Sequence, residues 1–210
     1  MSVVAAIEQG RLVPVIVVEN ESSAAPLAEA LVAGGLRCAE VTFRTAAARA
    51  ALRAMAADDR LLVGAGTVVT PDQVDAAVEA GAAFVVSPGF SLPVVRRCAD
   101  LGVATFPGVA TASDLMAAVQ EGLDVVKFFP AEPLGGVKMI SALAAPFPSM
   151  RFIPTGGITA ELLPRYLAHR AVAAVGGSWM VAPKLIAGGE WDEITRLTAE
   201  AVATAARTGE

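Results

Sequence analysis

The sequence contains few of the residues that bind transition metals. Among its 210 residues there are one histidine, His169, and two cysteines, Cys38 and Cys98. Zinc sites need three or four nitrogen, sulfur or carboxylate ligands at short spacings, and these three residues are far apart in the chain. We therefore expect no metal, and we interpret His169 as a surface residue near a helix end. Two cysteines make no disulfide framework, which favours buried, reduced thiols in a cytoplasmic protein.

Long apolar runs and clusters of basic residues are also missing. The longest uncharged apolar stretch near the C-terminus, 171–183, is interrupted by glycines and is shorter than the roughly 18 residues of a membrane span. The first ten residues lack the basic and apolar pattern of a signal peptide. A formal net charge of -5 without a basic patch argues against nucleic acid as a partner. The length fits a single domain over 1–210.

Lysine is scarce, with three residues against thirteen arginines. Lys127 stands inside the apolar run VVKFFP at 125–130, whereas Lys138 and Lys184 have polar or loop-like neighbours. A lysine is almost never fully buried unless it is paired or functional. Burial disfavours the charged ammonium and frees the neutral amine, which is the form that attacks a carbonyl to make a Schiff base. Lys127 is therefore predicted to be a nucleophile acting on a carbonyl substrate.

Short runs rich in β-forming residues recur at steps of about 20 to 22 residues and alternate with alanine-rich helical patterns. The predicted strands are 13–18, 39–43, 61–65, 84–87, 104–106, 125–128, 152–155 and 173–176. Predicted helix N-caps are Thr70, Ser91, Thr111 and Thr159, and predicted C-terminal stops are Gly34, Gly81, Gly102 and Gly122. This alternation is typical of a parallel α/β fold, and eight units favour a (β/α)8 TIM barrel. An open doubly wound sheet is the alternative.

Polar residues on two of these strands fall on one face. Because side chains alternate along a strand, Glu40 and Arg44 share a face, with Arg44 at the carboxyl-terminal mouth of the barrel. The same rule points Lys127 inward together with Val125 and Phe129. A structural ion pair is the alternative for Glu40 and Lys127, and neutralisation of Glu40 is the alternative for Arg44. Its position at the mouth favours binding of a substrate carboxylate by the Arg44 guanidinium.

The third strand is predicted to add a further polar residue. Alternation groups Thr67 with Val63 and Ala65, so we expect Thr67 to meet Glu40, Arg44 and Lys127 in one cavity. A threonine at the end of a strand is often only a turn or cap residue, which is the alternative for Thr67.

Two glycine pairs follow the last two predicted strands, in PTGGIT at 154–159 and VGGSW at 175–179. The loops after strands seven and eight are the usual phosphate site of these barrels, where backbone N–H groups hold the anion. We therefore predict a phosphate site that includes Gly156, Gly157 and the hydroxyl of Ser178.

Taken in order, seven motifs closely resemble those of the 2-keto-3-deoxy-6-phosphogluconate (KDPG) aldolases, a family that overlaps with the 4-hydroxy-2-oxoglutarate (KHG) aldolases. They are EVTFRT at 40–45, GAGTV at 64–68, SPG at 87–89, FPGVAT at 106–111, VKFFPAE at 126–132, PTGGI at 154–158 and GGSW at 176–179. The resemblance runs from the first predicted strand to the last helix.

The resemblance implies a (β/α)8 barrel, a homotrimer without a metal or other cofactor, and cleavage of KDPG to pyruvate and glyceraldehyde 3-phosphate in the Entner–Doudoroff route. It implies that Lys127 is the Schiff-base lysine and Glu40 the general acid and base. The implied substrate-binding residues are Arg44 and Thr67 for the pyruvyl carboxylate, and Thr155, Gly156, Gly157 and Ser178 in the two glycine loops. The substrate alternatives are 4-hydroxy-2-oxoglutarate and the phosphogalactonate epimer. A barrel that binds a phosphorylated metabolite without catalysis is the alternative of a different class.

Overall fold

The structure, a computed structural model, describes residues 2–208, in which helices alternate with parallel strands. The helices are α1 (Val3–Gly10), α2 (Ala24–Ala33), α3 (Ala48–Ala56), α4 (Pro71–Glu79), α5 (Leu92–Asp100), α6 (Ala112–Gln120), α7 (Gly136–Ala144), α8 (Leu163–Leu167), α9 (Pro183–Gly188) and α10 (Trp191–Arg207), with short 3-10 turns η1 (Glu21–Ser23) and η2 (Trp179–Val181). The strands are β1 (Leu12–Ile16), β2 (Cys38–Thr42), β3 (Leu62–Gly66), β4 (Phe84–Val86), β5 (Ala104–Phe106), β6 (Gly108–Val109), β7 (Val125–Phe128), β8 (Arg151–Pro154) and β9 (Val175–Gly177).

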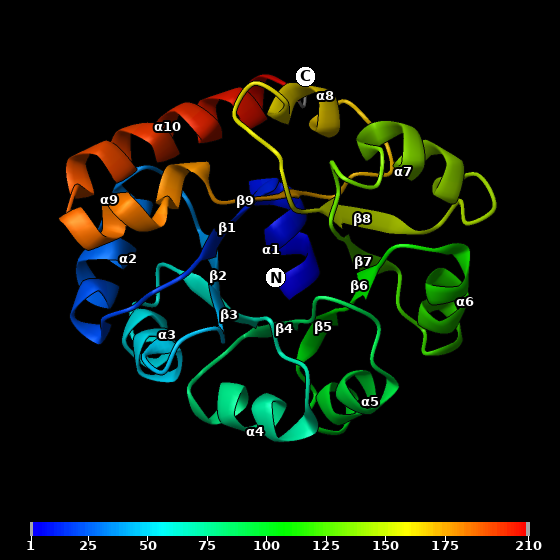
Figure 1. Cartoon of the computed structure of the whole chain (residues 1–210), viewed down its shortest axis with the longest axis horizontal. Coiled ribbons are helices and arrows are strands. Elements are labelled where there is room, and N and C mark those ends of the chain that lie inside the picture. Colours follow the sequence, from blue (N-terminus) through cyan, green and yellow to red (C-terminus); the bar gives the residue numbers. More distant parts are fainter. Residues whose placement is uncertain (1, 209–210) are drawn as a thin grey trace.

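Every predicted strand is present, with its ends displaced by at most two residues, and the two-residue strand β6 is additional. The strands form two parallel sheets, a six-stranded one in the order β5-β4-β3-β2-β1-β9 and a three-stranded one in the order β6-β7-β8. Isolated bridges at Phe152–Val172 and Thr155–Gly176 connect β8 to the chain around β9. The single continuous eight-stranded sheet that the sequence predicts is therefore seen only in part. In Figure 1 the strands curve around α1, and the other helices lie outside them.

The helix ends follow local sequence signals in most places. The Thr70 side chain accepts a hydrogen bond from the Gln73 N–H at the start of α4, and Thr111 forms a full capping box with Asp114 at the start of α6. Ser91 stands at the N-cap of α5 without a side-chain bond. The prediction for Thr159 was wrong, because α8 begins only at Leu163 and residues 159–162 form a turn.

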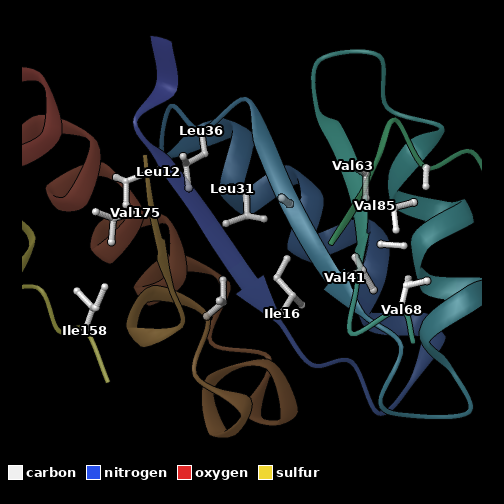
Figure 2. Close-up of a cluster of buried hydrophobic side chains, with 14 of the residues drawn as sticks. Leu12, Ile16, Leu31, Leu36, Val41, Val63, Val68, Val85, Ile158 and Val175 are labelled. Carbon is white, nitrogen blue, oxygen red and sulfur yellow. The ribbon is translucent and has the colours of Figure 1, made fainter. Parts of the chain in front are cut away.

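Apolar side chains form two layers on opposite faces of the strands. The outer layer lies between strands and helices, and Figure 2 shows Val41, Val63 and Val85 in it, with Leu31 of α2 packed on the sheet. The inner layer lies within the curve of the strands and consists of Ile7, Val13, Cys38, Phe84, Val86, Phe106, Val125, Ile153, Ala173 and Ala174. Ile7 comes from α1, so this helix closes the space at the amino-terminal ends of the strands.

Candidate active site

Lys127 and Glu40 form a buried ion pair inside the curve of the strands. Lys127 Nζ lies 3.2 Å from Glu40 Oε1, and the two residues are 6% and 3% exposed. They come from β7 and β2, which belong to different sheets and are separated by 87 residues. Alternation along both strands holds as predicted, since the neighbours Val41, Val126 and Phe128 pack in the outer layer.

Glycines on β3 make the space for this pair. Gly64 pairs with Glu40 in the register of the sheet, and a Cβ atom at Gly66 would lie 2.1 Å from Glu40 Oε1. Any side chain at position 66 would displace the carboxylate. At Gly64 and Gly66 the inward face of β3 is therefore backbone only, which leaves room for the glutamate.

The inward face predicted for Thr67 with Val63 and Ala65 was wrong. Val63 and Ala65 lie in the outer layer, so the inward residues of β3 are Leu62, Gly64 and Gly66. Thr67 follows the strand with φ +58, a left-handed conformation in which the alternation of an extended strand no longer applies. Its side chain is partly buried, and it does not line the cavity described next.

A cavity of about 330 Å³ adjoins the carboxyl-terminal ends of β1, β8 and β9. Its lining includes Arg44 and all of the predicted residues of the two glycine loops. The lining residues that the sequence predicted are Arg44, Thr155, Gly156, Gly157 and Ser178. The structure thus brings a guanidinium and both glycine loops to one cavity, with Thr155 buried and Ser178 exposed.

Phe129 connects this cavity to the buried pair. Its ring lines the cavity, and Lys127 Nζ lies 5.4 Å from the ring centroid, within the range of a cation–π contact. Lys127 itself pairs with Ile153 in the register of β7 and β8, so Phe129 and Thr155 lie one layer above it. The sequence predicted that the Phe129 side chain points inward, but it did not predict that this residue lines the cavity. Its place two residues after Lys127, on the same face of the strand, could have indicated this position.

Arg44 is free for an anion, because none of the ion pairs formed by residues 2–208 includes it. Glu40 is neutralised by Lys127, which removes the alternative that Arg44 serves only to balance Glu40. The cavity therefore has an exposed guanidinium, but Glu40 and Lys127, which were predicted to share it, do not line it and adjoin it through the Phe129 ring. A guanidinium near a buried lysine is suited to an anionic carbonyl compound.

The two cysteines lie where the sequence indicated, and His169 lies near a helix end as predicted but is half-buried instead of on the surface. Cys38 and Cys98 are buried free thiols, and burial raises the pKa of Cys38 to about 12. His169 follows α8 and its Nε2 lies 3.0 Å from Ser141 Oγ. Burial, with the nearby Arg170 charge, lowers the pKa of His169. Over residues 2–208, no cluster of three or more metal-ligating side chains is found, and no helix is long and apolar enough to span a membrane.

Comparison with known proteins assigns the chain to a family. The profile described as "Aldolase: KDPG and KHG aldolase" matches residues 3–197. The 2-dehydro-3-deoxy-phosphogluconate aldolase of Treponema pallidum is 51% identical over 196 residues, which cover 92% of each chain.

Two solved structures agree with this assignment. The KDPG aldolase of Zymomonas mobilis ZM4, crystallised with 3-phosphoglycerate, is 42% identical with a TM-score of 0.89, and the match covers 95% of this chain and 94% of that one. The KDPG aldolase of Legionella pneumophila, with pyruvate captured as a covalent carbinolamine, is 41% identical with a TM-score of 0.90, covering 93% and 96%. The chain belongs to the KDPG and KHG aldolase family.

Proposed function

We propose that this protein is a Schiff-base aldolase that cleaves KDPG to pyruvate and glyceraldehyde 3-phosphate. The observation that carries the proposal is the buried Lys127–Glu40 pair beneath a cavity lined by Arg44 and two glycine loops. The names and bound molecules of the relatives support it, since one holds a pyruvate carbinolamine and another 3-phosphoglycerate.

The buried pair provides the neutral amine that the reaction needs. Transfer of a proton from Lys127 Nζ to Glu40 across their 3.2 Å contact leaves an amine and a carboxylic acid. The amine attacks the C2 carbonyl of the substrate, and the carbonyl oxygen takes up a proton from Glu40. The carbinolamine then loses water to give an iminium ion.

The iminium ion acts as the electron sink for carbon–carbon cleavage. Glu40, through a water molecule, removes the proton of the C4 hydroxyl while the C3–C4 bond breaks and its electrons move into the iminium. Glyceraldehyde 3-phosphate leaves, and protonation of the enamine at C3 gives the pyruvate imine. Water hydrolyses this imine and regenerates Lys127.

The cavity residues hold the two ends of the substrate. Arg44 and Thr67 are proposed to bind the pyruvyl carboxylate, and Thr155, Gly156, Gly157 and Ser178 the phosphate. Arg44 and the four loop residues line one cavity, which supports this division. Thr67 lies outside that lining.

Borohydride reduction in the presence of pyruvate tests the nucleophile. Reduction of the imine should add the mass of the reduced pyruvyl group to Lys127, measured by peptide mass spectrometry, and Lys127→Ala should abolish both labelling and turnover. Glu40→Gln should still be labelled but should turn over about 10²–10⁴-fold more slowly, the usual contribution of a general acid and base. Label on another residue, or none in an active enzyme, would sink this mechanism.

The substrate within the family is settled by comparing phosphorylated and unphosphorylated compounds. We expect kcat/KM for KDPG to exceed that for 4-hydroxy-2-oxoglutarate, because only KDPG can use the glycine loops. The KHG activity is the second candidate, since the matching family profile includes it.

We further propose that the two sheets form one closed (β/α)8 barrel in a single domain over 1–210, of which residues 1, 209 and 210 lie outside the described part. The bridges between β8 and the chain around β9 support closure on one side, and β5 and β6 are separated by one residue on the other. A cytoplasmic homotrimer without a cofactor completes the proposal, and light scattering during gel filtration tests the oligomer.

A further inference from the structure

The only tyrosine of the chain is bonded to a carboxylate behind the first glycine loop. Tyr166 of α8 is 0% exposed, and its hydroxyl donates a hydrogen bond to Glu132 Oε1. Glu132 stands five residues after Lys127, in the segment that leaves β7. A buried phenol hydroxyl needs a partner, and this bond fixes Glu132 to the last turn of α8.

The backbone of the same segment is bonded to the glycine loop. The Ala131 N–H donates to the Thr155 carbonyl at 2.8 Å, and the Glu132 N–H donates to the Gly156 carbonyl at 3.0 Å. These bonds continue the pairing of β7 and β8 beyond the ends of both strands. A shift of Glu132 would therefore move Thr155 and Gly156 relative to Lys127.

Two further glycines determine where the Glu132 side chain can go. A Cβ atom at Gly157 would lie 2.9 Å from Glu132 Cβ, so this loop glycine faces the aliphatic part of the side chain. A Cβ atom at Gly136 would lie 2.8 Å from both Glu132 Oε1 and the Tyr166 hydroxyl, so the carboxylate faces α7 and α8. The negative charge is thereby turned away from the glycine loop. Burial, with the Glu132 contact, raises the pKa of Tyr166 above its ordinary range, so the phenol remains a donor.

We propose that Tyr166 and Glu132 are positioning residues for the phosphate end of the site. Their bond holds the loop 155–157 in register with β7 and keeps the Glu132 carboxylate from repelling a phosphate. This inference rests on the proposed function, and it assigns the pair to binding of the phosphate rather than to the chemistry at Lys127.

Tyr166→Phe tests the pair, because it removes one oxygen and keeps the buried ring. We expect KM for KDPG to rise about tenfold, the loss expected from one hydrogen bond to a charged group, with kcat changed less than about twofold. Cleavage of 4-hydroxy-2-oxoglutarate and borohydride labelling with pyruvate should be unchanged. Glu132→Gln in the Tyr166→Phe background should lower KM for KDPG again, because it removes the freed charge.

Ser141→Ala is the matched control, since it removes a different side-chain hydroxyl bond, the one from Ser141 of α7 to His169 just after α8, without touching the loop. It should leave KM for both substrates unchanged. If Tyr166→Phe leaves the preference for KDPG intact, because kcat/KM is unchanged or falls equally for both substrates, the inference is overturned. A wild-type enzyme without any preference for KDPG would instead overturn the proposed function.

Discussion

At the scale of residues, the site depends on a charge pair that the fold has removed from water. Breaking a buried ion pair by removing one partner is costly, because the remaining charge has no compensation. In the proposed mechanism the pair also has a chemical use, since a proton moves between the two groups. The 3.2 Å contact between Lys127 and Glu40 is therefore both a structural bond and the resting state of the proposed reaction.

Gly66→Ala should inactivate the enzyme without unfolding it. The new methyl group would lie 2.1 Å from Glu40 Oε1, so the carboxylate must move away from Lys127. A displacement of about 1 Å in a catalytic group costs on the order of 10²-fold in rate, which is the loss of kcat that we expect.

Gly10→Ala is the control for this substitution, because a Cβ atom at Gly10 would meet nothing within 4 Å. Circular dichroism should show that both variants are folded. Normal kcat in Gly66→Ala would show that Glu40 does not need this position.

At the scale of elements, helix α1 has a role that its place at the start of the chain does not suggest. Ile7 is 1% exposed and packs with Val13, Phe84 and Val125 in the inner layer. It also lines the small space of about 10 Å³ beneath Lys127 and Glu40. The helix thus closes the interior below the ion pair and keeps water from it.

Ile7→Ala should lower the free energy of unfolding by about 2–5 kcal/mol, because it leaves a cavity in a packed layer that cannot collapse. Urea denaturation followed by fluorescence or circular dichroism gives this value. Val4→Ala, at a half-buried position of the same helix, should cost clearly less. Equal losses of unfolding free energy in the two variants would mean that Ile7 has no special role in closing the interior.

At the scale of the whole molecule, stability should decline at alkaline pH through the buried thiol of Cys38. Burial raises its pKa from 9.0 to about 12, and its Sγ donates to the Leu12 carbonyl. Above pH 9 the unfolded chain releases this proton while the folded protein keeps it, so the unfolded state gains stability as pH rises. The contribution is complete below about pH 9 and is lost between 9 and 12, by up to about 1.4 kcal/mol per pH unit.

Urea denaturation at increasing pH under reducing conditions measures this effect. Cys38→Ala should have a shallower decline of the unfolding free energy than the wild type over the same range. Parallel declines in the two proteins would show that other groups cause the alkaline loss.

The amino-acid sequence by itself determined the alternation of strands and helices and the residues that are proposed to do chemistry. Periodic apolar runs and caps such as Thr70 and Thr111 are local, so every strand except β6, as well as the starts of α4 and α6, could be predicted. Lys127 could be picked out because a charged residue is unusual inside an apolar strand. The alternation of side chains along β2 then indicated that Glu40 points into the same interior.

Only the tertiary structure decided how these residues meet. The direction of the Thr67 side chain depends on its left-handed backbone conformation. The need for glycine in β3 becomes clear only from the position of the Glu40 carboxylate next to Gly66. The bond between Tyr166 and Glu132 and the closure of the interior by α1 join segments that no local pattern relates. Sequence patterns report what each residue does within its own strand or helix. Contacts between residues distant in the chain are fixed by packing, which is a property of the whole fold.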